Sequence, residues 1–297
     1  MVVRTEYWEE TGRSNKTFLR DQVLEKGDIM FRLNWKTILF CSCFLSIIAV
    51  APHPAVGLPP GNHALDFDGD DDFLEVFDPV SLTGPFTIEA WVLVRDGAGG
   101  RICANSSGIT GYDFDFAGGG SGMNLRFGIS NQNQIMVDFD AYVGEWTHVA
   151  VSGTGAIGQD VRLFINGELA GTEVVNQRLV ASTTNLHIGC LTIGMYYFDG
   201  AMDELRIWNA ELDQSMIQTY MNRIVDACHP EYPALKGCWC LDEGSGQIAA
   251  SVVGGCQLDG YLGVNLGDDI SDPVWITSGV TPAEKCSFGR VKAMFAD

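Results

Sequence analysis

Hydrophobic and polar residues alternate from Leu65 to about Asn209, in short runs that are separated by Gly, Asn and Asp. Alternation with a period of two turns one side of a strand toward a core and the other side toward polar surroundings. Many short strands at this spacing indicate an antiparallel sandwich of two sheets. The strands expected from the pattern are 86–94, 113–116, 124–129, 134–139, 146–152, 161–165, 168–170, 185–189 and 200–208.

The turns between these runs carry their own signals. Asn166-Gly167 stands between two alternating runs, which is the strongest short-range indication of a hairpin. Residues 153–158 match the G-x-G-x-x-G pattern of nucleotide-binding loops, but such a loop must follow a strand and open a helix. A strand pattern follows here, so we expect a hairpin loop. Leu212 to Ile224 has apolar residues at helical spacing, which predicts one short helix after the last strand.

The N-terminal part has the features of a targeting segment. Residues 30–57 combine a short basic stretch, an apolar run too short to span a membrane readily, and small residues at the spacing of a cleavage site. We therefore expect a signal peptide at 30–57, and no stable membrane insertion after its cleavage. Residues 1–29 form a polar extension that is not translated if Met30 is the initiator. A single-pass anchor is the alternative.

The chain is strongly acidic, with a formal net charge of −20, and 46% of its residues are hydrophobic. Residues after 57 carry 32 acidic and 11 basic side chains. This balance argues against a nucleic-acid binder, which needs a basic surface, and disfavours adhesion to anionic lipid. It is compatible with bound cations or with neutral ligands such as sugars.

The cysteines indicate disulfides if the chain is exported. Seven of the nine follow the expected signal peptide, and five of those seven lie after position 227. Because seven is odd, at least one thiol should be free or intermolecular. A zinc site is the rival interpretation, although Cys238-x-Cys240 lacks the usual gap of two to four residues.

Five segments carry a common set of motifs, in order and at suitable separations: Leu65–Leu74, Phe86–Val92, Glu145–Val151, Arg162–Gly167 and Phe198–Asn209. As a set they resemble the laminin-G-like domains of the concanavalin A-like lectin/glucanase family. The resemblance covers about residues 64–222. It implies an all-β, two-sheet antiparallel jelly-roll sandwich, often with a calcium at one edge. It does not imply one function, because this fold hosts carbohydrate binders, adhesion modules and enzymes.

The chain after this domain departs from the family's layout. We place the domain at 61–226, a Cys-rich, strand-rich extension at 227–285 and a tail at 286–297. Tyr232–Gly246 resembles the strand that normally leads into such a domain, but here it follows the domain. The extension either folds back onto the same sandwich or is a truncated second repeat. We favour folding back, because an isolated strand pair is marginally stable.

Five aspartates crowd positions 66–72, where a solvated turn, a cation site or catalytic carboxylates would each explain them. Alternate residues project carboxylates on one side of a strand end, and the spacing is not that of an EF-hand. In the family this strand runs beside the last strand of the domain. We therefore expect one structural Ca²⁺, with a solvated turn as the alternative. The expected ligands are Asp68, Asp70, Asp71, Asp72, Asp199 and Asp203.

Aromatic residues indicate a second kind of site. Tyr196, Tyr197 and Phe198 form a cluster in a loop-like stretch, and sugar rings stack on exposed aromatic rings. Tyr112 and Asn131 are expected contributors. The alternative is a loop that covers its own apolar side chains.

These observations favour a secreted or cell-surface binding module for a glycan or glycoprotein. The first alternative is an adhesive module that contacts other proteins. The second is a glycoside hydrolase of the same fold, which needs two placed carboxyl groups. The chain lacks the Glu-x-Asp-x-x-Glu strand motif of the family's glucanases, so we expect no enzyme.

Overall fold

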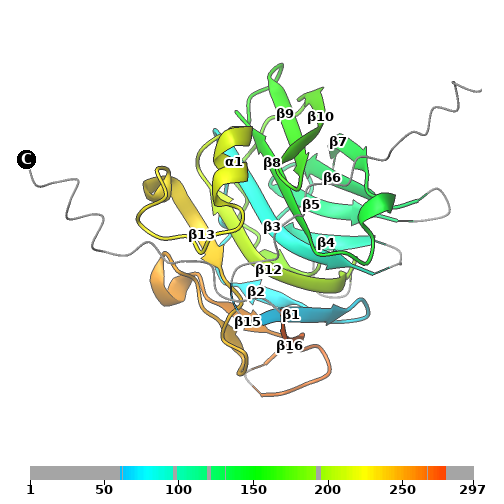
Figure 1. Ribbon diagram of the computed structural model, residues 1–297, viewed down its shortest axis with the longest axis vertical. Helices are drawn as coiled ribbons and strands as arrows, with labels where there is room; N and C mark the ends of the chain where they lie inside the picture. The colour runs from blue at the N-terminus through cyan, green and yellow to red at the C-terminus, as the bar shows by residue number, and fades with distance from the viewer. Residues whose placement is uncertain are drawn as a thin grey trace, which may run out of the picture. The chain divides into compact units, whose positions relative to one another are not determined.

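The computed structural model describes residue 61 and residues 63–95, 99–118, 122–130, 132–191, 195–265 and 267–278. The extension 1–29, the signal-like segment 30–57 and the tail 286–297 lie outside the described residues. Within the described part, the chain forms two antiparallel sheets of eight strands each (Figure 1). The predicted all-β, two-sheet jelly-roll sandwich is therefore confirmed.

The first sheet, called sheet A, has the order β10-β9-β8-β3-β12-β1-β16, and β13 also pairs with β12. Its strands are β1 (His63–Asp68), β3 (Phe86–Val94), β8 (Thr147–Gly153), β9 (Asp160–Ile165), β10 (Glu168–Val174), β12 (Asp199–Trp208), β13 (Leu235–Trp239) and β16 (Val274–Thr277).

The second sheet, called sheet B, has the order β14-β15-β2-β11-β4-β5-β6-β7. Its strands are β2 (Leu74–Val76), β4 (Gly99–Ala104), β5 (Tyr112–Ala117), β6 (Asn124–Ile129), β7 (Gln132–Asp138), β11 (Leu186–Ile188), β14 (Ile248–Ala249) and β15 (Gly260–Leu262). Single 3-10 turns lie at Asp140–Tyr142, Tyr232–Ala234 and Gly255–Gln257.

The core lies between the two sheets and follows from the period-two pattern. Alternate residues of β3, from Phe86 to Val94, are buried in it together with Phe114 and Phe127 of sheet B. The rings of Phe86 and Phe127 stack across the sheets with centroids 5.1 Å apart. Burial of this apolar surface from both sheets is the main source of stability.

Both sequence signals for turns hold in the structure. Asn166 and Gly167 have φ values of 52° and 75° and join β9 to β10, as expected for a tight hairpin. The glycines of residues 153–158 join the antiparallel strands β8 and β9. The loop is therefore a hairpin connection and not a nucleotide-binding loop.

The predicted helix, α1 (Gln214–Tyr220), begins after Asp213, whose carboxylate accepts a hydrogen bond from the Met216 backbone. It is shorter than the apolar pattern suggested. Ile217 packs in a second apolar cluster with residues on the outer face of sheet A, including Trp208. The helix and the segment after it thus cover a face that would otherwise leave tryptophans in water.

Beneath this cover, Glu89 of β3 is the centre of a buried polar network. It accepts hydrogen bonds from Trp208 Nε1 at 3.1 Å and Arg206 Nη1 at 3.4 Å, and His148 Nε2 lies at 3.4 Å. Burial alone would raise the pKa of Glu89, but the His148 hydrogen bond and the Arg206 charge lower it to about 2.

Strands from the expected C-terminal extension enter both sheets. β13 pairs with β12 and β16 with β1, while β15 pairs with β2 (Figure 1). Trp239, Leu241 and Leu262 join the core between the sheets. The extension therefore contributes side chains to the same core as the preceding strands.

Because Cys286 lies outside the described residues, the disulfides expected from the sequence stay a prediction. Cys103, Cys190, Cys238, Cys240 and Cys256 are free thiols. Burial raises the pKa of the Cys190 thiol to about 12, so this group stays protonated at neutral pH. Among the described residues, no helix has both the length and the apolarity that crossing a membrane requires.

Replacing Trp239 by Ala should destabilise the whole sandwich, because this buried ring belongs to the core although it comes from β13. We expect a loss of about 3–5 kcal/mol in the free energy of unfolding, measured by urea denaturation. Ile248→Ala, at an exposed position of the same C-terminal segment, is the control. Equal stability of the two variants would show that this segment does not support the core.

Candidate ligand-binding site

A layer of paired charges covers part of the outer face of sheet B. Tyr112, Phe114 and Phe116 of β5 point into the core, so the intervening Asp113 and Asp115 face outward. Asp115 stands opposite Arg101 of β4 on one side and Arg126 of β6 on the other. The strand register alone therefore places one carboxylate between two guanidinium groups.

The contacts within this layer are close. Arg126 Nε donates to Asp115 Oδ1 at 2.7 Å, and Arg101 Nη1 lies 3.2 Å from Asp115 Oδ2. Ser106 Oγ donates to Asp113 Oδ1 at 2.6 Å. Arg101 Nε lies 3.6 Å from the same oxygen and has no hydrogen-bond partner in the described part of the chain. One guanidinium donor in the layer thus remains unused.

Burial dominates the electrostatics of the two aspartates. It raises the pKa of both Asp113 and Asp115, although Ser106 opposes the rise for Asp113 and both arginines oppose it for each carboxyl. Paired charges that are held in fixed positions away from water give a surface with preset hydrogen-bond donors and acceptors.

Tyr196 lies over this layer and is 57% exposed. The guanidinium carbon of Arg101 is 4.8 Å from the centroid of its ring, which is cation–π geometry. The Tyr196 carbonyl accepts a hydrogen bond from the Arg101 backbone N–H at 3.1 Å. Its φ of 57° is uncommon for a residue other than glycine. The ring is thus anchored at its base and open to solvent on its outer side.

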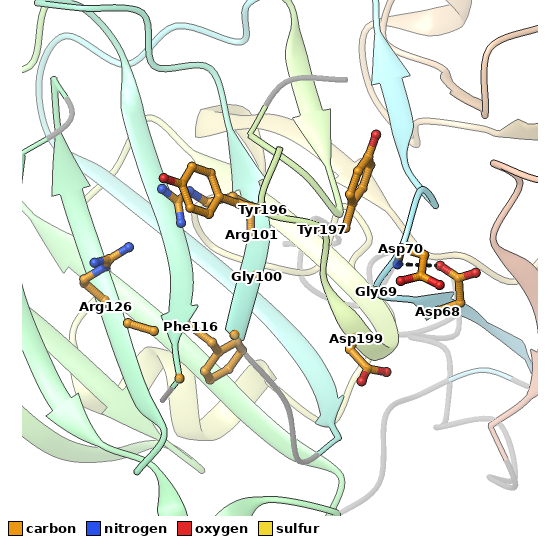
Figure 2. A pocket seen from close by; sticks show the side chains of 13 residues that line it. Asp68, Gly69, Asp70, Gly100, Arg101, Phe116, Arg126, Tyr196, Tyr197 and Asp199 are labelled. Atoms are coloured by element: carbon orange, nitrogen blue, oxygen red, sulfur yellow. Dashed lines mark hydrogen bonds between the residues drawn. The ribbon is translucent and has the colours of Figure 1, made fainter. Parts of the chain in front are cut away.

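Two adjoining pockets, of about 500 and 480 Å³, share Arg101, Arg126 and Tyr196 as lining residues. Figure 2 shows these three at one end of the larger pocket and Asp68, Asp70 and Asp199 at the other, with Tyr197 between them. Asp113 and Asp115 line only the smaller pocket, and we call the two adjoining pockets together the tyrosine pocket.

Glycine in β4 lets the loop that carries the two tyrosines approach the sheet. A Cβ at Gly100 would lie 2.3 Å from the Tyr197 carbonyl oxygen, so a larger residue would push that loop away.

The acidic turn at the other end of the tyrosine pocket is internally hydrogen-bonded. Asp68 Oδ1 accepts from the Asp70 backbone N–H at 2.8 Å, and Asp72 Oδ2 accepts from that of Asp68 at 2.8 Å (Figure 2 marks the first of these). Asp68, Asp71 and Asp72 each offer a carboxylate oxygen within 4.8 Å of the others. Burial, together with the charges of nearby aspartates, raises the pKa of Asp72 to about 6.

The other expected calcium ligands are placed differently. Asp70 is exposed and lies outside the group of converging carboxylates. Asp199 pairs with Asp68 in the sheet, as expected, but its carboxylate binds Arg95 Nη1 at 3.0 Å. Asp203 is not at the turn, because it lies four residues further along β12 and is fully buried.

Two of the expected aromatic contributors are not on the surface. Phe198 is 1% exposed and packs in the core, with its ring 5.8 Å from that of Phe67. Tyr112 is buried and its hydroxyl donates to the Val80 carbonyl at 3.2 Å. Tyr112 points inward from β5 and Phe198 from the position just before β12, so neither ring can contact a surface ligand. Asn131 lies outside the described residues.

The sequence interpretation missed Arg101, Asp113, Asp115 and Arg126. A signal was present, since aspartate is depleted in strands and two of them alternate with aromatics in Asp113-Phe-Asp-Phe116. That pattern indicates an outward charged face, but it does not identify the partner strands.

A second aromatic surface lies elsewhere on sheet B. Phe77 is 63% exposed, and its ring centroid is 5.3 Å from that of Tyr261. These rings line a pocket of about 400 Å³ together with Glu75 and Asn265. The pocket has one charged side chain, so it lacks the paired charges found at the tyrosine pocket.

Several solved structures resemble this chain in fold. A candidate carbohydrate-binding protein from Bacteroides ovatus aligns with a TM-score of 0.56 and 19% identity, over 75% of this chain and 62% of its own. A pentraxin from Limulus polyphemus aligns with a TM-score of 0.49 and 16% identity, over 68% and 95%. A sialidase CBM40 module from Ruminococcus gnavus aligns with a TM-score of 0.41 and 12% identity, over 52% and 96%. This chain thus spans less than two thirds of the Bacteroides protein.

A search of curated proteins finds no match to the sequence. The family comparison does find one, because residues 68–218, about half of the chain, match the Laminin_G_3 model. This range contains the acidic turn, the charged layer of sheet B and β12. The chain therefore belongs to the laminin-G-like family of the concanavalin A-like lectin/glucanases superfamily.

Proposed function

We propose that this protein is a carbohydrate-binding module and that the tyrosine pocket holds the sugar. The observation that carries the proposal is the exposed Tyr196 ring, fixed over a layer of paired arginines and aspartates of which only Arg126 is half-buried and the rest are buried. A sugar ring can stack on the open side of an aromatic ring, while polar groups around it fix the hydroxyls.

The chemistry of the layer fits sugar hydroxyls. Arg101 and Arg126 supply hydrogen-bond donors for sugar oxygens, while Asp113 and Asp115, which are 3% and 1% exposed, hold these donors in place from below. Because these side chains are already fixed by their contacts with one another, they lose little conformational entropy when a sugar binds. The net charge of −20 favours neutral glycans over polyanionic ones.

The comparisons with known proteins agree with this proposal but do not establish it. The Bacteroides ovatus protein is a candidate carbohydrate binder of the same fold, but one fold serves many functions. We further propose that the module acts outside the cell, on the basis of the signal-like sequence at 30–57. Adhesion to proteins and glycoside hydrolysis are the alternatives, and binding and reducing-end assays on the same ligands separate them.

We also propose a structural Ca²⁺ at Asp68, Asp71 and Asp72, whose oxygens converge within 4.8 Å. Calcium binds such hard oxygen ligands, and water can complete its coordination. The raised pKa of Asp72 supports the proposal, because a nearby cation would stabilise the charged carboxylate. Asp199 is left out, since Arg95 already neutralises it.

Tyr196→Ala should weaken glycan binding by at least about tenfold, which is about 1.4 kcal/mol, because it removes the stacking surface. Glycans that bind the wild-type chain on an array are titrated against both proteins by calorimetry. Phe77→Ala is the matched control, since it removes an equally exposed ring from the other aromatic pocket. Unchanged affinity in Tyr196→Ala would remove the proposed site.

Adding Ca²⁺ should raise the melting temperature, and a chelator should reverse the rise, because the ion binds only the folded turn. Asp72→Asn should abolish the shift, whereas Asp70→Asn should keep it, since Asp70 lies outside the converging group. Differential scanning fluorimetry measures all three proteins. A wild-type melting temperature that is the same with Ca²⁺ as with the chelator would contradict the calcium site.

In calcium-free buffer, the stability of the wild-type chain should fall relative to Asp72→Asn between about pH 4 and pH 6.5. The pKa of the Asp72 carboxyl is about 6 in the folded chain and 3.8, its ordinary value, in the unfolded chain. Between these two values the unfolded chain releases this proton more readily, so a rising pH stabilises the unfolded state relative to the folded state. The difference should reach at most about 3 kcal/mol in urea unfolding. Parallel pH profiles of the two proteins would show that Asp72 does not titrate abnormally.

A further inference from the structure

Three potential metal ligands meet on the outer face of sheet A, and none of them lines a pocket described above. They are Cys238 on β13, Cys240 just after it and Glu204 on the neighbouring β12. Each offers one ligand atom, and the three atoms lie within 4.8 Å of one another. The two sulfur atoms are 3.9 Å apart.

The pairing of β13 with β12 explains why these residues meet. Cys238 stands opposite Arg206, and residues two apart along a strand share one face. Cys240 and Glu204 therefore lie one step further along on that face. A Cys-x-Cys spacing, which does not fit the usual metal-binding loops, suits a strand when the next strand supplies another ligand.

The distance between the sulfurs fits tetrahedral metal binding. Zinc–sulfur bonds of about 2.3 Å at a tetrahedral angle place two sulfurs ~3.8 Å apart. A disulfide is disfavoured, because residues two apart on an extended strand have Cα atoms ~6.6 Å apart, near the upper limit that a disulfide spans.

The Glu204 carboxylate has an unused oxygen. The residue is 1% exposed, and its Oε2 is held by Arg206 Nη2 at 2.9 Å. Its Oε1 is buried without a hydrogen-bond partner in the described part of the chain. An unpartnered buried carboxylate oxygen is costly, and a bound cation would remove that cost.

The buried charges around the cluster are also unbalanced. Arg206 is shared between Glu204 and Glu89, and both carboxylate oxygens of the adjacent Asp203 lack a partner within the described residues. Arg206 thus contacts two buried carboxyl groups, and a third, that of Asp203, has no ion-pair partner among the described residues. Burying unpaired negative charge is strongly unfavourable, whereas a divalent cation would offset the excess.

We propose that Cys238, Cys240 and Glu204 bind a thiophilic divalent metal ion such as Zn²⁺. Two thiolates select such an ion over calcium or magnesium, and a water molecule would complete the coordination. The ion would tie β13, from the C-terminal segment, to β12 in the centre of sheet A.

The test uses the full chain, prepared under reducing conditions with Zn²⁺ and then freed of unbound metal. Mass spectrometry of the metal content should find one equivalent of zinc in the wild-type protein. Replacement by Co²⁺ should give a thiolate-to-cobalt charge-transfer band, which reports sulfur ligation without any substitution in the chain.

Cys240→Ser should lower the zinc affinity by at least about tenfold, the lower limit for losing a group that merely supports a metal ligand. Cys256→Ser, at an exposed cysteine outside the cluster, should retain the metal. The proposal is overturned by a wild-type chain without zinc, by a Cys238–Cys240 disulfide in the metal-treated protein, or by a cobalt complex that lacks the charge-transfer band.

Discussion

Strand β12 is hydrogen-bonded along both edges, with β3 on one side and with β1 and then β13 on the other. Nine of its ten residues are buried, so its register cannot slip without moving a whole set of side chains to the wrong face. This pairing sets Asp199 beside the acidic turn and places Glu204 next to Cys238 and Cys240. The acidic turn and the cysteine cluster therefore depend on how one central strand is shared by three neighbours, whereas the charged layer of sheet B depends on β5 and its two neighbours.

A second constraint is the shortage of positive charge in a chain with a net charge of −20. Two arginines are each shared between two carboxylates: Arg95 contacts Asp66 and Asp199, and Arg206 contacts Glu89 and Glu204. On sheet B the arginines and aspartates balance, which leaves a fixed but neutral surface suited to sugar hydroxyls. Carboxylates exceed arginines at the acidic turn and beside the cysteine pair, and these are the two places where we propose bound cations.

Local patterns in the sequence predicted most strands, the Asn166-Gly167 hairpin and the short helix, but they missed β4, and the jelly-roll architecture was predicted from the resemblance to the family. The site was harder to predict because it depends on register between distant strands. Tyr196 was identified from its loop, but Phe198 and Tyr112 face the core, and Asp203 lies too far along β12 to reach the turn. Arg101 and Arg126 can be identified as part of the charged layer only once the register of β5 is known, because that register places Asp115 between them. Likewise, Cys238-x-Cys240 acquires a third ligand only through β12.

The central claim is that the charged layer of sheet B and Tyr196 together form a sugar-binding surface. A crystal structure of the chain with its tightest-binding oligosaccharide tests this most directly. We expect one sugar ring to stack on Tyr196, with its hydroxyls hydrogen-bonded to Arg101 or Arg126. A sugar seated instead between Phe77 and Tyr261, or on the outer face of sheet A, would contradict the claim.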